Sequence, residues 1–155
     1  MRDMTYKEYE QRGRNKLLND FNNSKTPIQY EFTHNRYNTI DCFATATTTN
    51  TTYAIEIKDR DISIDKYEEY ILELHKYKSL MVAYEEYGYK PIYRCYFKDG
   101  VLTWDLSLLK NVEERVTEIK AAESTQDYDT KVMKKIILLK KDEAIDKNRG
   151  NINNC

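Results

Sequence analysis

Two carboxylates and one ammonium group stand close together in the central part of the chain, at Asp41, Glu56 and Lys58. Carboxylate oxygens are the ligands that Mg²⁺ prefers in proteins, and a bound cation would offset the repulsion between the two acids. Such a cation could polarise a phosphate and lower the pKa of a bound water. A neighbouring lysine could orient or deprotonate that water and balance negative charge. We therefore predict a site for phosphodiester hydrolysis, with Asp41 and Glu56 as metal ligands and Lys58 serving the water.

A β-hairpin would bring these three residues together. Residues 39–47 and 53–58 each alternate between apolar and polar side chains, which is typical of strands. A polar run of threonines and one asparagine separates the two segments and favours a turn. With Asp41 opposite Glu56, the turn is centred within that run, and directly opposed residues have Cβ atoms roughly 4.5–5.5 Å apart. Lys58 follows two positions later on the same face, so the spacing predicts one patch of three charges.

The same spacing also fits a cluster of charges at the surface. A Glu-x-Lys step is common on half-exposed strands, and an opposed aspartate could simply pair with the lysine. The chain would then be an unrelated α+β interaction protein. Separation of the three side chains in space, or a lack of pairing between the two segments, would favour this alternative.

A helix is expected to precede the hairpin. Over residues 4–21, apolar and small residues recur at spacings of three and four, so they share one stripe of a helix. Glu10 lies on that stripe toward the core, although it could also pair with Arg14 one turn later. A polar break follows, and residues 28–33 are expected to form a short strand.

The remaining chain predicts alternating helices and strands. Tyrosines and leucines recur at spacings of three and four after Ser63, a residue suited to an N-cap, until Gly88. Lysines on this helix, Lys76 among them, could reach phosphates or form a solvated face. The elements expected are a helix at 64–87, strands at 91–97 and 101–106, a helix at 108–122 and a strand at 132–139.

Length and composition indicate one domain. The chain has 155 residues, of which 40% are hydrophobic and 33% charged, a composition typical of globular proteins. No repeat or linker divides it, so residues 1–145 are expected to form a single α+β domain, with a central mixed β-sheet flanked by helices. Residues 146–155 are polar and are expected to form a frayed tail.

Charge and cysteine content narrow the function classes. The 25 Lys and Arg residues nearly balance the 26 Asp and Glu residues, so net charge gives no basic signature of nucleic-acid binding. The three cysteines match neither a zinc spacing nor a disulfide framework, which indicates a reducing compartment. No segment is apolar enough for a signal peptide or a membrane span, and we expect a cytoplasmic protein.

The order of these elements resembles that of the PD-(D/E)XK nuclease superfamily. Over about residues 4–106, a helix and a strand precede the strand with Asp41, the Glu56-Ile57-Lys58 strand, a helix and paired strands. Asp41 corresponds to the first acidic motif and Glu56-Ile57-Lys58 to the (D/E)-x-K motif. No proline precedes Asp41, and family members often lack that proline. The resemblance implies a restriction-endonuclease-like fold with an αβββαβ core.

This resemblance also implies a function. Members of the superfamily bind Mg²⁺ through these acids and hydrolyse DNA, and many place a glutamate of the first helix near the metal, a position that Glu10 would fill. We therefore expect a small Mg²⁺- or Mn²⁺-dependent DNA endonuclease of phage or mobile-element origin, such as a Holliday-junction-resolvase-like enzyme, and a homodimer is one expected state. The alternative is a non-catalytic nucleic-acid-binding or assembly protein that keeps the nuclease fold.

Overall fold

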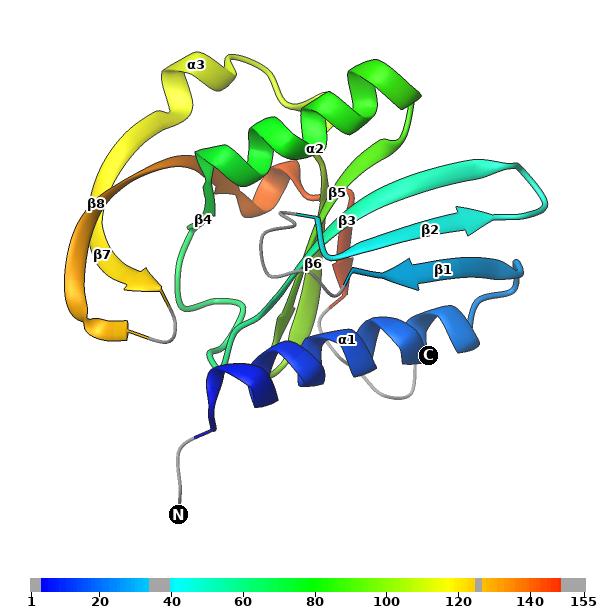
Figure 1. Ribbon diagram of the computed structural model, residues 1–155, viewed down its shortest axis with the longest axis horizontal. Helices are drawn as coiled ribbons and strands as arrows, with labels where there is room; N and C mark the ends of the chain where they lie inside the picture. The colour runs from blue at the N-terminus through cyan, green and yellow to red at the C-terminus, as the bar shows by residue number, and fades with distance from the viewer. Residues whose placement is uncertain (1–3, 34–39, 125–126, 149–155) are drawn as a thin grey trace.

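Helices and strands alternate along residues 4–33, 40–124 and 127–148, the part of the chain that the computed structural model describes (Figure 1). The elements are α1 (Tyr6–Asn22), β1 (Ile28–Phe32), β2 (Cys42–Ala46), β3 (Thr51–Asp59), β4 (Glu69–Glu73), α2 (Leu74–Tyr87), β5 (Lys90–Phe97), β6 (Gly100–Asp105), α3 (Val112–Arg115), β7 (Val116–Ser124), β8 (Asp127–Lys140) and β9 (Asp146–Asn148), with 3₁₀ turns at Leu106–Leu108 and Lys141–Glu143.

Strands of the described ranges form two sheets. Six of them form a mixed sheet in the order β1-β2-β3-β5-β6-β9, and three form a smaller sheet in the order β4-β8-β7. Strand β3 runs parallel to β5, and the other neighbouring strands run antiparallel. Helix α1 lies on one face of the larger sheet and α2 on the other (Figure 1). The expected α+β class, with a central mixed sheet flanked by helices, is therefore confirmed.

Helix α1 is held closely against β3. It starts with a capping box, in which the Thr5 hydroxyl accepts a hydrogen bond from the Glu8 amide and the Glu8 carboxylate accepts one from the Thr5 amide. Gly13 allows a close approach, since a Cβ at that position would lie 3.1 Å from Ile57 Cγ2. Leu17, one turn later, is buried. The apolar stripe expected from the sequence is thus the face that packs on the sheet.

Ion pairs fasten the same helix to the end of β3. The side chain of Asp59 is only 2% exposed and binds both Arg12 and Lys16 of α1, the latter at 3.2 Å. A buried carboxylate with two cationic partners is well compensated. These contacts fix the N-terminal half of α1 beside the last residues of β3.

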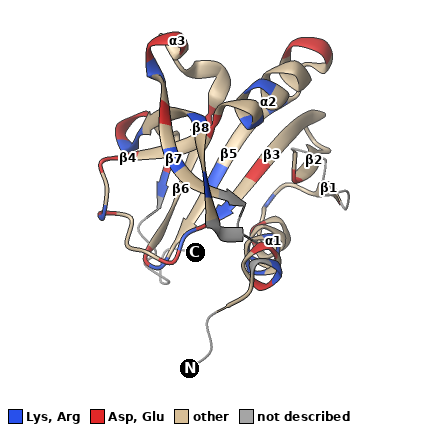
Figure 2. Cartoon of the chain, turned by 60° about the vertical axis from the view of Figure 1, so that its left-hand side comes forward, with Lys and Arg blue, Asp and Glu red and all other residues tan. Residues whose placement is uncertain are grey.

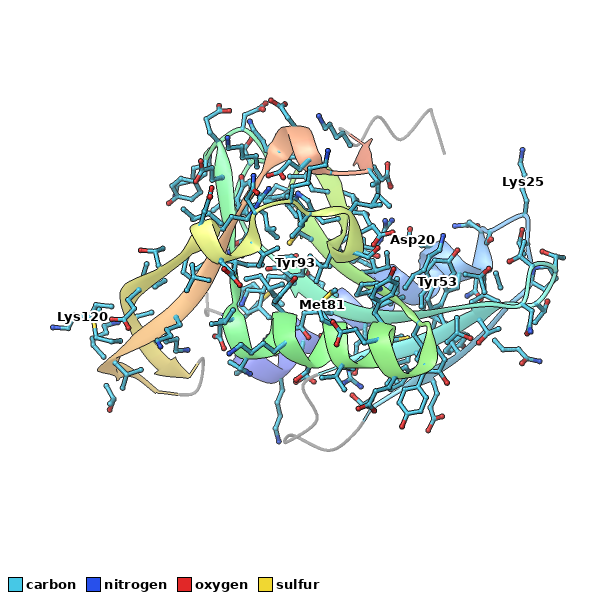
Figure 3. The ribbon with its side chains drawn as sticks, turned by 90° about the horizontal axis from the view of Figure 1, so that it is seen from above. Asp20, Lys25, Tyr53, Met81, Tyr93 and Lys120 are labelled. Carbon is cyan, nitrogen blue, oxygen red and sulfur yellow. The ribbon has the colours of Figure 1, made fainter. Side chains whose placement is uncertain are left out.

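The opposite face of the sheet is covered by α2. Leu80 and Ala83 are buried, and they belong to a core that includes Ala54 of β3 and Trp104 of β6. Figure 3 shows Met81 of α2 in front of Tyr93 of the sheet. The same view places Lys120 of β7 and Lys25, which follows α1, at opposite ends of the molecule. The smaller sheet therefore extends away from the hairpin side of the larger one.

The long helix expected at 64–87 is wrong in its first part. Residues 69–73 form β4, which pairs with the end of β8, and α2 begins only at Leu74. Ser63 does not cap this helix, which starts only at Leu74; its hydroxyl accepts from the Asp65 amide at 3.3 Å and donates to Asp99 Oδ2 at 2.7 Å. Pairing with a distant strand therefore overrides the helical spacing of the apolar residues.

The helix expected at 108–122 is also wrong. Only Val112–Arg115 forms a helical turn, and the residues after it enter β7, which pairs along β8. Glutamates, lysines and alanines make this stretch a good helix former by itself. Its pairing with β8 supplies the stronger interaction.

Several expected strands are confirmed. The segment at 28–33, both hairpins and the strand at 132–139 are all present, and the last is longer than expected. Residues 146–148 of the expected tail form β9 on the edge of β6, whereas 149–155 lie outside the described residues.

Candidate functional site

A cleft of about 470 Å³ opens where β3 runs beyond the end of β2. The ladder between these strands ends at the pair Cys42–Ile55, whereas β3 continues to Asp59. Figure 2 shows both acidic and basic segments on the sheet between α1 and α2. The cleft is lined by all four residues that the sequence singles out, which are Glu10, Asp41, Glu56 and Lys58.

Asp41 is fixed beside Glu56 by the hairpin. The last pair of the ladder is Cys42 and Ile55. In this register the next pair would be Asp41 and Glu56, which is the register that the sequence predicts. The amide of Asp41 donates to the carbonyl of Ile55 at 3.1 Å. Asp41 Oδ2 in turn accepts a hydrogen bond of 2.8 Å from the amide of Ile57. The backbone of β3 therefore holds one carboxylate of the site in position.

Glu56 is the buried acid of the site, with 3% of its surface exposed. Burial raises the pKa of Glu56, and the negative charge of Asp41 raises it further, to about 8. Lys76 of α2 opposes this shift but does not cancel it, although its Nζ donates to Glu56 Oε1 at 2.7 Å. The fold thus brings two acids together without fully stabilising both of their charges.

Lys58 shares the face of β3 that carries Glu56. Burial lowers the pKa of Lys58, and the neighbouring cations Arg60 and Lys76 lower it further. Lys58 forms no hydrogen bond or ion pair with any residue of the described ranges. Its ammonium is therefore available to a ligand in the cleft.

Glu10 reaches the cleft from α1. It lines the same space as the two acids of the hairpin, and 39% of its side chain is exposed. Arg14 Nη2 lies 3.2 Å from Glu10 Oε1, and it also donates to the carbonyl of Thr33 at 2.7 Å. The pairing with Arg14 is therefore confirmed, and Glu10 lines the cleft from an exposed position rather than from the core.

The donor set fits one hydrated Mg²⁺ or Mn²⁺ ion. Among the described residues, no group of three or more His, Cys, Asp or Glu side chains is placed to hold a metal. One oxygen of Asp41 binds the Ile57 amide and one oxygen of Glu56 binds Lys76, so each carboxyl group keeps a second oxygen. Mg²⁺ usually binds through one or two carboxylates and keeps several waters or phosphate oxygens as its other ligands.

No protein-family model, curated protein or solved structure matches this chain. Within the described ranges, no helix is long and apolar enough to cross a membrane. The case for a function therefore depends on the geometry of the cleft.

Lys76 is the residue of the site that the sequence analysis did not select. It appeared there only as one of the helix lysines that could reach phosphates or form a solvated face. In the structure it lies one turn before Leu80 and two turns before Ala83, the buried residues of α2. A charged residue on the buried stripe of a helix needs a partner, and this spacing was visible in the sequence. The buried face of α2 was not, because the expected stripe ran through tyrosines before Leu74 that lie outside α2.

Proposed function

We propose that this protein is a Mg²⁺- or Mn²⁺-dependent DNA endonuclease that hydrolyses phosphodiester bonds. The observation that carries the proposal is the meeting of Asp41, Glu56 and Lys58 in one cleft. Glu56 is buried and its strand is paired with that of Asp41, which argues against a mere cluster of charges at the surface. Two acids and a lysine that has no partner in the described part of the chain are the groups that phosphodiester hydrolysis needs.

Each residue of the cleft has a role in this proposal. Asp41 and Glu56 hold the metal ion, and a bound Mg²⁺ supplies positive charge that stabilises the reacting phosphate. Lys58 Nζ donates to the attacking water and offsets the negative charge that develops on the phosphate. The hydrogen bond from the Ile57 amide keeps Asp41 in place, so that ligand needs little rearrangement. Glu10 adds a carboxylate at the α1 side of the cleft.

The order of elements supports the same proposal. Leaving β4 aside, the chain runs α1-β1-β2-β3-α2-β5, which is the αβββαβ order implied by the resemblance to PD-(D/E)XK nucleases. Asp41 lies immediately before β2, and Glu56 and Lys58 lie on β3, which is where that resemblance puts its motifs.

DNA is the proposed substrate because cations surround the acids. Arg14, Arg60 and Lys76 line the cleft together with Lys58, and such side chains suit a phosphate backbone. Cys42 and Cys95 are free thiols, which fits action in the reducing cytoplasm. A homodimer that presents two clefts would suit a substrate with two scissile strands.

Cleavage assays test this function. Linear, single-stranded, supercoiled and four-way-junction DNA would be incubated with Mg²⁺, Mn²⁺ or EDTA. We expect metal-dependent cutting, reduced at least about 100-fold in Glu56→Gln and in Lys58→Met. Lys78→Met serves as the matched control, because Lys78 is an exposed lysine of α2 outside the cleft. If no substrate is cut and calorimetry detects no Mn²⁺ binding, a non-catalytic binding or assembly role becomes the better account.

A further inference from the structure

Lys76 of α2 holds Glu56 from the face of the sheet on which the Glu56 side chain lies. Its Nζ donates to Glu56 Oε1 at 2.7 Å, and the Glu56 side chain is 4% exposed. The Lys76 side chain is 31% exposed, so its stem crosses from the buried stripe of α2 to the surface of the cleft. The Lys76 ammonium is therefore hydrogen-bonded to one oxygen of Glu56, a proposed metal ligand.

The neighbouring lysine of the helix shows that this contact is specific. Lys78 lies two positions later, is exposed and has no partner among the described residues. Glu73, at the start of α2, binds Lys134 at 3.1 Å and also pairs with His75. Lys76 is thus the lysine of α2 that this helix directs at Glu56.

We propose that Lys76 is a built-in counter-cation of the metal site, which holds Glu56 until a divalent ion displaces it. The inference rests on the proposed function and adds a regulatory residue to that same site. An ammonium and a divalent cation repel each other, so they compete for the Glu56 carboxylate. Because the lysine stem is flexible and partly exposed, the displaced ammonium turns toward the open side of the cleft, where a phosphate of the substrate would meet it.

This role has a consequence for metal affinity. Replacement of Lys76 by a neutral residue leaves Asp41 and Glu56 without their nearest counter-charge. Once Glu56 is ionised, the two acids then gain more from a bound cation than they do in the wild-type protein, so the variants are compared at alkaline pH, where a proton does not compete with the metal for Glu56. Loss of a lysine from a metal site would in this case strengthen metal binding, whereas loss of an ordinary structural ion pair would not.

Calorimetric titration with Mn²⁺ tests the proposal on Lys76→Met, on Lys78→Met as the matched control, and on the double variant Lys76→Met/Glu56→Gln. Lys76→Met keeps the length and apolar stem of the lysine. We expect it to bind Mn²⁺ about tenfold or more tightly than the wild type. Lys78→Met should bind as the wild type does, and the double variant should lose the gain. Thermal unfolding with Mn²⁺ or EDTA should show a larger metal-dependent shift in Tm for Lys76→Met.

The possible outcomes separate the two proposals. Equal Mn²⁺ affinity of the wild type and Lys76→Met would overturn the role of Lys76 and leave the metal site intact. A lack of Mn²⁺ binding in every variant would overturn the proposed function and the role of Lys76 with it. Tight binding that survives in the double variant would put the metal away from Glu56 and also refute the inference. Should Lys76→Met not fold, Lys76→Gln keeps a hydrogen-bond donor without the charge and allows the same comparison.

Discussion

Charged residues gather on both faces of the central sheet, and the two groups are built differently. On the α1 face, the Arg94 guanidinium donates to Asp20 Oδ2 at 2.8 Å and to Thr103 Oγ1 at 2.6 Å. The Tyr96 hydroxyl donates to the same oxygen of Asp20 at 2.6 Å. Figure 3 shows Asp20 beside the sheet, at the α1 side. We call Arg94, Asp20, Tyr96 and Thr103 the Arg94 cluster.

The cleft on the other side lacks this balance. Two acids, Asp41 and Glu56, stand next to each other, and Lys58 has no partner among the described residues. In the Arg94 cluster each charge faces an opposite charge or a hydroxyl, and the pKa of Arg94 is raised because its anionic partners outweigh its burial. A satisfied network stabilises a fold, whereas neighbouring like charges in a cleft indicate a ligand site.

The largest effect is expected from Arg94→Met. Removal of the guanidinium leaves Asp20 with only the Tyr96 hydroxyl and leaves Thr103 without this donor, which should lower the free energy of unfolding by about 2–3 kcal/mol. Urea denaturation measures this loss. Asp146→Asn is the matched control, because Asp146 is 48% exposed and lies 3.4 Å from the guanidinium, and it should cost under about 1 kcal/mol. Equal, small losses in both variants would show that the Arg94 cluster does not hold the fold.

Gly13→Val should give the next largest effect, since it acts on the wall of the cleft. A side chain at this position collides with Ile57, and the overpacking should cost about 1–3 kcal/mol and weaken Mn²⁺ binding. Gly88→Ala is the control: its φ of 71° makes alanine strained by about 1 kcal/mol, but nothing lies within 4 Å. Calorimetry should find normal Mn²⁺ binding in Gly88→Ala. Similar Mn²⁺ affinity of Gly13→Val and Gly88→Ala would show that the packing of α1 does not affect metal binding in the cleft.

Glu56→Gln should change stability in the opposite direction from Arg94→Met. Folding raises the pKa of Glu56 from 4.5 to about 8. Its protonated form therefore stabilises the fold below pH 4.5, and this contribution is lost as the pH rises through about 8. In EDTA, the free energy of unfolding of the wild type should fall by at least about 1 kcal/mol over that range. Glu56→Gln should show a flatter pH profile and exceed the wild type at alkaline pH; parallel profiles would contradict the assigned origin of the shift.

Glu10→Gln should have the smallest effect. The carboxylate is partly exposed and pairs with Arg14 four residues later, an interaction worth less than about 0.5 kcal/mol. Denaturation should therefore barely distinguish it from the wild type, while cleavage assays report whether this carboxylate serves the reaction. A stability loss as large as that of Gly13→Val would mean that Glu10 stabilises the packing of α1 against the sheet.

The proximity of Asp41 and Glu56 could be predicted because the two strands that position them are close in sequence. Asp41 directly precedes β2 and Glu56 lies on the neighbouring strand β3, and a short polar turn joins the two strands, so alternation and turn position together determine the register. By contrast, β4 pairs with a strand that lies far along the chain, with Glu73 opposite Ile136. No local pattern encodes that partner, and the spacing of apolar residues in 64–87 suits a helix as well.

Lys76 could not be assigned for the same reason. Its role depends on which face of α2 is buried, and the tyrosines of residues 64–73, which lie outside α2, shift the face that is inferred from the sequence. A helix drawn from Ile64 puts the buried stripe on its tyrosines and leaves Lys76 outside it. The helix observed from Leu74 puts Lys76 in line with Leu80. The missing information was thus a long-range strand pairing rather than a property of the lysine.

The pairing of β4 with β8 also sets an order of events during synthesis. The β2–β3 hairpin, with both acids, can form as soon as it leaves the ribosome, because its contacts are local. Tyr70 and Leu72 of β4 are buried in the finished protein, yet their partner strand is translated much later. Until then this apolar edge is open to other chains.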